Sequence, residues 1–258
     1  GFEVGEIDIL LNGDSAGGDG LAKGDTEPEI DRAEELRAKW GVESGQLWAM
    51  GDHRLLCGDS SQNPEFGATC ETAIFDPPWE FISSQSAIHC ASVIAFCDGQ
   101  RQADVVRLYG APTWVFVWDC VSSWYTPNRP LRRMKLALWY GNIDQYEFNG
   151  WHYGDAGNRR EVTNSRGSYT FEPDARGKHL SDVFVSPITR LHAEAEHSHS
   201  KPMDWVSMLI GNCTRGDIFD PFCGSGTTII AGENLGRRVL AIEISPAYVA
   251  VALERWHQ

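Results

Sequence analysis

Residues 216–243 read GDIFDPFCGSGTTIIAGENLGRRVLAIE, and this stretch decides the fold class. A short apolar run at 217–219 leads into a glycine-rich turn at 220–226. Thr227–Leu235 then have the spacing of a helix, and Val239–Ile242 form a second apolar run. The order of strand, turn, helix and strand is the layout of a nucleoside-binding unit in a parallel sheet.

The turn and the acid that follows it suggest the ligand. Gly224 and Gly226 let the backbone pass close to a bound molecule where a Cβ would clash. Glu243, about 20 residues beyond the glycines, can accept hydrogen bonds from two ribose hydroxyls. The turn has neither GxGxxG spacing nor a P-loop lysine. These features favour a nucleoside without phosphates, such as S-adenosylmethionine; the alternative is a plain glycine turn.

A second motif, AIFDPPW at residues 73–79, follows another apolar run. Pro77 and Pro78 stiffen the loop and lack N–H groups, so its carbonyls stay free as acceptors. Asp76 adds a carboxylate and Trp79 a flat apolar face, which together suit a planar base with an exocyclic amine. A base in a duplex must leave the stack to reach such a pocket. The alternative is a rigid turn with Trp79 in the core.

Apolar runs alternate with helical patterns along most of the chain. This predicts an α/β fold with a doubly wound, mixed and mostly parallel sheet, covered on both faces, whose ligand lies at the carboxyl ends of the strands. The predicted strands are Thr72–Phe75, Thr113–Trp118, Lys135–Tyr140, Asp217–Phe219 and Val239–Ile242.

The chain divides into three parts by composition. Residues 1–28 are rich in Gly and Asp and predict a flexible acidic linker. Residues 29–46 form a helical lead-in, because 29–40 have apolar side chains at helical spacing. Residues 47–258 are expected to form one domain. Residues 141–190 interrupt its pattern with Gly, Asn, Asp and Arg, which predicts an irregular insertion carrying specificity.

The net charge of −14 over 258 residues argues against a nucleic-acid partner if it is taken as uniform. The charge is uneven, however. Residues 1–40 hold eleven acidic and four basic side chains, a balance of −7. Residues 125–190 hold ten basic and seven acidic side chains, a balance of +3. Because screening limits each field to about 10 Å, a local basic face can coexist with an acidic total.

Together the two motifs resemble the S-adenosylmethionine-dependent amino-methyltransferases of DNA. In that family (D/N/S)PP(Y/F/W) is the catalytic motif and DPFxGSGTT the cofactor motif; here they are 76–79 and 220–228. The catalytic motif comes first, which is similar to the permuted beta group with its Rossmann-like fold. The resemblance runs from about Leu47 to Trp256, and its motifs have a bacterial or phage-like form. It implies that Asp76, Pro77, Pro78 and Trp79 are catalytic.

Further positions match the family residue by residue. Residues 48–60 resemble its opening segment, whose Gly-Asp lies near the cofactor adenine. Residues 197–202, HSHSKP, resemble its HPxxKP, although Ser198 stands where Pro is usual. Residues 241–245 resemble the ribose-binding strand. The resemblance therefore assigns the cofactor to Asp59, Lys201, Pro202, Asp220, Phe222, Gly224, Ser225, Gly226, Thr227 and Glu243.

The family resemblance also bears on the methylated atom. An aspartate at position 76 indicates adenine N6, since the cytosine-N4 members more often have Ser there; N4 is the alternative. A C5-cytosine enzyme needs a Pro-Cys nucleophile, and no cysteine follows a proline in this sequence. Two further alternatives are an enzyme acting on adenine in RNA and a DNA-binding relic without activity.

Two basic regions are candidates for contacts with DNA. Arg129, Arg132 and Arg133 precede a predicted strand and could contact phosphates. Residues 150–178 interleave arginines, including Arg159 and Arg160, with aromatic residues, which suits target recognition. For both regions the alternative is an ordinary solvated charged surface.

The remaining features concern location and assembly. Seven scattered cysteines without a CxxC pair indicate reduced thiols in the cytoplasm. No apolar run reaches the roughly 18 residues of a membrane span, so no membrane partner is expected. Residues 1–11 weakly resemble the tail that follows a ParB-like domain in phage proteins. We therefore expect the catalytic part of a longer chain. The resemblance to the beta group, whose members often dimerise, implies a homodimer.

Two residue patterns have a structural interpretation. His192, His197 and His199 do not have the spacing of a standard metal site, and no metal is expected. Trp114, Phe116 and Trp118 alternate along one predicted strand and are expected in the core of the sheet.

Overall fold

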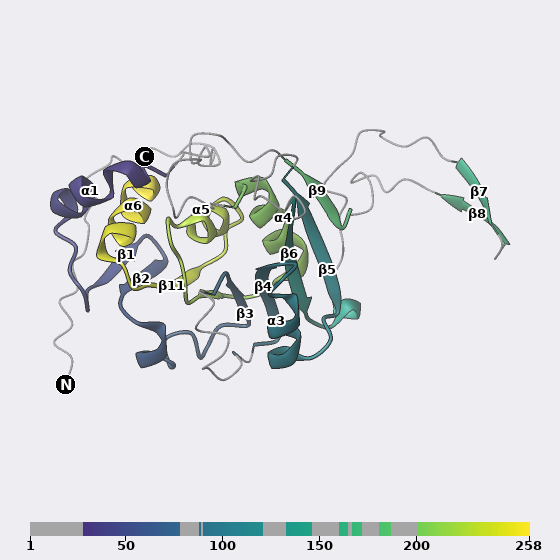
Figure 1. Cartoon of the computed structure of the whole chain (residues 1–258), viewed down its shortest axis with the longest axis horizontal. Helices are drawn as coiled ribbons and strands as arrows, with labels where there is room; N and C mark the ends of the chain where they lie inside the picture. Colours follow the sequence, from purple (N-terminus) through teal and green to yellow (C-terminus); the bar gives the residue numbers. More distant parts are fainter. Residues whose placement is uncertain are drawn as a thin grey trace, which may run out of the picture.

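The computed structural model describes residues 28–77, 88, 90–120, 133–145, 160–164, 167–171, 181–186 and 201–258. Within these residues the chain forms a nine-stranded mixed sheet with helices on both faces, and a second sheet of two strands (Figure 1). The predicted α/β class with a mixed sheet is confirmed. The linker predicted at 1–28 lies almost entirely outside the described residues.

The main sheet has the strand order β1-β2-β11-β10-β3-β4-β6-β5-β9. All of its strands run in one direction except β1 and β6, which are antiparallel to their neighbours. The strands are β1 Leu47–Met50, β2 His53–Cys57, β3 Thr72–Phe75, β4 Ser92–Asp98, β5 Trp114–Asp119, β6 Met134–Tyr140, β9 Val183–Val185, β10 Ile218–Asp220 and β11 Val239–Glu243.

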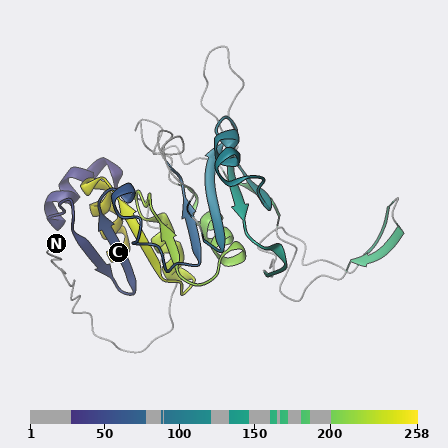
Figure 2. The same ribbon diagram turned by 90° about the horizontal axis from the view of Figure 1, so that it is seen from below.

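The helices form two layers, which Figure 2 shows from below. One hydrophobic core lies between the sheet and α1, α4, α5 and α6, and a smaller core lies on the other face against α3. The helices are α1 Ala33–Trp40, α3 Gln102–Tyr109, α4 Met203–Cys213, α5 Thr227–Asn234 and α6 Pro246–His257, with short 3-10 turns η1 Ile30–Arg32, η2 Ser60–Gln62 and η3 Ile143–Gln145. Among the described residues every helix is too short or too polar to traverse a lipid bilayer.

Side-chain alternation explains how one strand serves both cores. In β3 the side chain of Ile74 belongs to the larger core, whereas Ala73 and Phe75 belong to the core beneath α3. Because both faces are covered, all four residues of β3 are buried. A strand buried on both faces therefore appears in the sequence as a continuous apolar run.

The five predicted strands are all present, with bounds shifted by no more than one residue at an end. The predicted helix at 29–40 is confirmed, with a 3-10 turn at its start. The sequence patterns did not predict β1, β2, β4, α3, α4 or α6. Strand β4, with the sequence SVIAFCD, is central and buried on both faces like β3, and it lies outside the two motifs.

Two expectations need correction. The range 141–190 is not wholly irregular, because β9 pairs with β5 in the main sheet, and β7 Arg160–Asn164 pairs with β8 Gly167–Phe171. Figure 1 shows the β7–β8 hairpin standing away from the main sheet. Phe116 and Trp118 are buried as expected, but Trp114 is 45% exposed. Strand β9 pairs only with the end of β5, at 117–119, so the start of β5 lies at an uncovered edge.

Gly226 packs closely against α6. Its φ is +84°, and a Cβ at this position would lie 2.9 Å from the Cβ of Ala252. Both the backbone conformation and the helix contact therefore require glycine.

We predict that Gly226→Ala lowers the free energy of unfolding by about 2–4 kcal/mol, from backbone strain and overpacking combined. Urea denaturation measures this change. The matched control is Gly236→Ala, where φ is +62° but nothing lies within 4 Å of the added Cβ. The control should cost only about 1 kcal/mol. Equal losses in the two variants would exclude a packing role for Gly226.

Candidate active site

Three acidic side chains gather at one edge of the main sheet. Glu243 ends β11, Asp220 ends β10, and Asp76 directly follows β3. These strands are parallel, and β10 lies between the other two. Because neighbouring strands lie about 4.8 Å apart, the carboxyl ends of β11 and β3 are separated by about 10 Å.

A cavity of about 290 Å³ opens at this edge. Its walls come from the ends of β3, β10 and β11, from the glycine-rich turn, and from the beginning of α6. Eight residues predicted from the sequence line it: Asp76, Lys201, Asp220, Phe222, Gly224, Ser225, Thr227 and Glu243. The two motifs, which are more than 140 positions apart in the sequence, therefore face one shared space.

Glu243 links the glycine-rich turn to the end of β11. Its Oε2 accepts a hydrogen bond from the N–H of Gly224 at 2.8 Å, and its Oε1 accepts one from the N–H of Ser245 at 2.9 Å. Burial raises the pKa of the Glu243 carboxyl, although these backbone N–H groups act against the rise. Burial and the Glu243 charge also raise the pKa of the Tyr248 hydroxyl, which lines the same cavity.

Asp220 is the most deeply buried acid of the cavity, at 3% exposure. Burial raises the pKa of its carboxyl to about 6. Hydrogen bonds from the Thr228 side chain and from the Phe222 N–H, the latter at 3.0 Å, favour the ionised form and limit the rise. Asp220 therefore changes its charge close to neutral pH.

Asp76 forms an ion pair with Lys201. The Nζ of Lys201 contacts Oδ2 of Asp76 and lies 4.5 Å from the centroid of the Phe96 ring. The Lys201 side chain is 15% exposed, whereas that of Asp76 is 45% exposed. A cation held over an aromatic face and against a carboxylate is stabilised at both contacts. Asp76 thus lines the cavity and stays partly exposed while it is paired with Lys201.

The two glycines of the turn have different roles. Gly224 has a φ of +54° with open space where a Cβ would lie, and it lines the cavity. Gly226 also has a positive φ, but its Cα faces Ala252 of α6 and it is outside the cavity lining. The expected approach of a ligand thus fits Gly224, whereas Gly226 serves the packing of α5 on α6.

Other predicted residues lie outside the cavity lining. Asp59 is exposed and caps η2, its Oδ1 accepting from the Ser61 N–H at 2.8 Å; it follows β2, beside β11, on the same sheet edge. Pro202 is the N-cap residue of α4. Pro77, which directly follows Asp76, is buried. Pro78 and Trp79 lie outside the described residues, and their assigned roles stay predictions.

Of the arginines expected to contact DNA, Arg129, Arg132 and Arg159 lie outside the described residues, as do His192, His197 and His199. Arg160 begins β7. Arg133 makes a bidentate ion pair with Asp119: its Nε donates to Oδ1 at 3.1 Å and its Nη2 to Oδ2 at 2.8 Å. Its guanidinium is thereby held at the end of β5, on the surface.

Seven lining residues were not among the predicted site residues. Phe75, Cys223 and Thr228 belong to the two motifs, whereas Ile30, Phe96, Val206 and Tyr248 come from outside them. Phe96 belongs to β4, which was itself missed. Tyr248 follows a recognisable helix start, because Ser245 caps α6 and Pro246 occupies its first position. Ile30 comes from η1, in the lead-in segment, and no local signal connects that segment with the cavity.

A DNA methylase family model of the N6/N4 type matches residues 108–254, more than half of the chain. The chain belongs to this family. It is 35% identical over 83 residues to the Type II methyltransferase M2.DpnII of Streptococcus pneumoniae, covering 31% of each chain. It is 30% identical over 104 residues to M2.LlaDCHI of Lactococcus lactis subsp. cremoris, covering 38% of this chain and 39% of that one. The aligned part thus spans about a third of the length of these relatives.

Solved structures share the fold of this family member. The M1.HpyAVI–SAM complex superposes with a TM-score of 0.55 at 17% identity, over 78% of this chain and 98% of that one. The cytosine-N4-specific PvuII DNA methyltransferase gives a TM-score of 0.50 at 14% identity, over 78% and 85% of the two chains. At these identities the likeness concerns the fold.

We predict that Asp220→Asn flattens the pH dependence of stability between about pH 4 and pH 6. The folded state keeps a proton on Asp220 up to about pH 6, whereas the unfolded chain releases it near its ordinary pKa of 3.8. The wild-type free energy of unfolding should therefore fall as the pH rises through this window and then level off, by up to about 3 kcal/mol from this group.

Urea denaturation at a series of pH values measures this effect as the difference between wild type and variant. Asp31→Asn, at an exposed position on η1, is the matched control and should keep the wild-type slope. If Asp220→Asn also keeps the full wild-type slope, the raised pKa of Asp220 is wrong.

Proposed function

We propose that the protein transfers a methyl group from S-adenosylmethionine to the exocyclic N6 amine of an adenine that is flipped out of DNA. One observation carries the proposal. The same cavity is lined by Asp76 at one end and by the glycine-rich turn with Glu243 at the other. A nucleoside cofactor and a target base bound to these two ends would meet in between, as a direct transfer requires.

The residues at the β11 end fit the cofactor. Open space beside Gly224 allows a ligand to approach the backbone closely. The carboxylate of Glu243 is held by backbone hydrogen bonds and borders the cavity, where a ribose hydroxyl could donate to it. When bound, S-adenosylmethionine supplies an activated methyl group on a positively charged sulfur.

The residues at the β3 end fit an amine. Oδ1 of Asp76 and the carbonyl of Pro77 would accept hydrogen bonds from the two N–H groups of the adenine amine. Two acceptors draw the nitrogen toward tetrahedral geometry and localise its lone pair for attack on the methyl carbon. By the family resemblance, Trp79 would stack on the base. The reaction then needs no covalent intermediate with the protein.

The choice of adenine rests on Asp76, the residue typical of N6 enzymes in the family resemblance. The family spans N6 and N4 methylation, so the N4 amine of cytosine is the alternative acceptor. Both amines present the same two N–H donors to Asp76 and Pro77. These two contacts therefore fit either base, and the product must be identified directly.

The partner, the cellular location and the assembly of the protein are also part of the proposal. DNA is the partner, with Arg129, Arg132, Arg133, Arg159 and Arg160 contacting it. All seven cysteines are free thiols and none is exposed, which fits the reducing cytoplasm of a bacterial or phage-infected cell. A homodimer and an upstream ParB-like domain stay predictions.

The direct test is incubation of mixed-sequence DNA with methyl-labelled S-adenosylmethionine, followed by mass spectrometry of the nucleosides. We expect label in N6-methyl-2′-deoxyadenosine. Label in N4-methyl-2′-deoxycytidine would select the alternative acceptor. With structured RNA added as a competitor, label only in ribonucleosides would overturn the proposed substrate.

We predict that Asp76→Ala lowers methyl transfer at least about 100-fold, because the amine loses its main acceptor. Cofactor binding, measured by calorimetry, should stay close to the wild-type value, since Asp76 lies at the far end of the cavity from Glu243. The matched control is Asp98→Ala, which removes a carboxylate at the end of the adjacent strand β4 and outside the cavity lining. This control should keep both properties. Retained turnover in Asp76→Ala would refute the catalytic role.

A further inference from the structure

The wall of the cavity includes a residue from outside the predicted catalytic domain. Ile30, in the 3-10 turn η1, lines the cavity together with Tyr248 and Glu243. Its side chain is only partly buried, although it packs against the larger core. Ile30 therefore presents part of its apolar surface to the cavity.

The lead-in segment is held in this place by apolar packing. Leu36 of α1 is fully buried in the larger core, and Ala33 and Trp40 pack against the same core. Helix α1 lies along α6, and η1 also contacts α6, whose first turn carries Tyr248. Burying a leucine side chain stabilises such a contact by about 1.5–3 kcal/mol.

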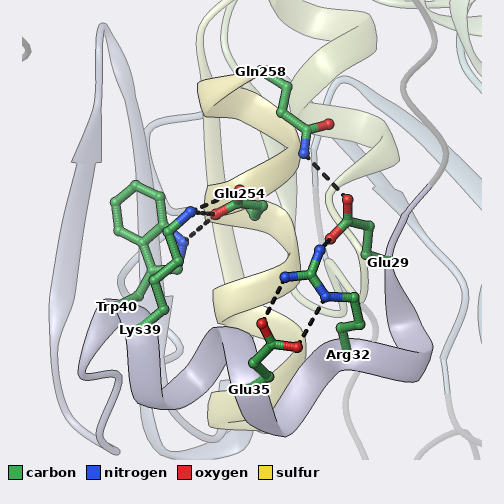
Figure 3. A network of polar contacts seen from close by, with 7 residues as sticks. All are labelled: Glu29, Arg32, Glu35, Lys39, Trp40, Glu254 and Gln258. Atoms are coloured by element: carbon green, nitrogen blue, oxygen red, sulfur yellow. Dashed lines mark hydrogen bonds and ion pairs between the residues drawn. The ribbon is translucent and has the colours of Figure 1, made fainter.

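Polar contacts fix the register of α1 on α6, as Figure 3 shows. The carboxylate of Glu254 accepts hydrogen bonds from Lys39 at 2.6 Å and from the Trp40 indole at 2.8 Å. Nearer η1, Glu29 accepts from Arg32 at 2.5 Å and from the Gln258 amide at 3.5 Å. These contacts flank Ile30 along the chain and bind both ends of the segment to the last helix.

The strand order decides which end of a ligand Ile30 would meet. Along the sheet edge, β11 with Glu243 comes first, then β10 with Asp220, and then β3 with Asp76. Helix α6 follows β11 directly, so Tyr248 and the η1 segment lie at the Glu243 end. The charged pair of Lys201 and Asp76 lies at the opposite end. An apolar side chain beside an aromatic ring suits the flat face of a purine.

We propose that Ile30 contacts the nucleoside end of the cofactor, so that the segment preceding the catalytic domain completes the cofactor site. This inference rests on the proposed function, because it takes S-adenosylmethionine as the ligand. It makes the affinity for the cofactor depend on the docking of η1 and α1 onto α6. Ile30 would act as a binding residue that the two sequence motifs do not include.

The test is calorimetry with the full chain, using S-adenosylmethionine and, separately, adenosine, which has only the nucleoside end. Ile30→Ala should weaken both ligands about tenfold, from the loss of apolar contact. Ile30→Val, which keeps most of that contact, should weaken them less than threefold. Asp31→Ala is the matched control, an exposed residue of the same turn, and should bind like the wild type.

Thermal unfolding without ligand checks that each variant folds. If Ile30→Ala does not fold, the ligand affinity of Ile30→Val is compared with that of the wild type. Wild-type affinity in the folded Ile30→Ala protein would overturn the inference while leaving the proposed function intact. Loss of affinity for S-adenosylmethionine but not for adenosine would overturn the placement at the nucleoside end. A wild-type protein that binds neither ligand would defeat the proposed function and this inference together.

Discussion

The carboxylate of Glu243 accepts hydrogen bonds from the backbone of Gly224 and of Ser245, and so ties the turn after β10 to the turn after β11. Two further backbone bonds support the same junction, from Cys223 to Ile242 and from Gly58 to Glu243. A buried carboxylate is costly unless it is hydrogen-bonded, so the glycine turn and the acid stabilise each other. Glu243 and Gly224 both line the cavity, so this junction forms part of its wall.

Because the strands are parallel, this junction lies at the same sheet edge as the other acidic residues of the cavity. Strands β11, β10 and β3 deliver their carboxyl ends to one edge, and each carries an acid there. Their environments differ: Glu243 is held by backbone N–H groups, Asp220 is buried, and Asp76 is paired with a lysine. One edge of the sheet therefore presents an acceptor of fixed geometry, an acid that titrates near pH 6 and an accessible charged acceptor.

The two glycines of the turn have roles that the motif alone does not distinguish. Both Gly224 and Gly226 have positive φ, as the tight turn requires. From the sequence, both glycines are expected to let the backbone pass close to a ligand. Their roles differ because Ala252 of α6 lies against one of them and open space lies against the other. That difference depends on where a helix more than 20 residues further on packs, which no local pattern records.

The family, the α/β class and most of the cavity lining follow from residues 73–79 and 216–243, and the five predicted strands follow from their apolar runs, because turn chemistry and apolar runs are local properties. Strand β4 and its Phe96 did not follow, because this strand lies outside both motifs and only its pairing with β3 and β6 shows its place in the sheet. The role of Ile30 did not follow either. It arises only when α1 packs along α6 and brings a residue from the start of the described chain beside Glu243, near its end. The sequence thus determined which chemical groups are present, and tertiary packing decided which of them share one space.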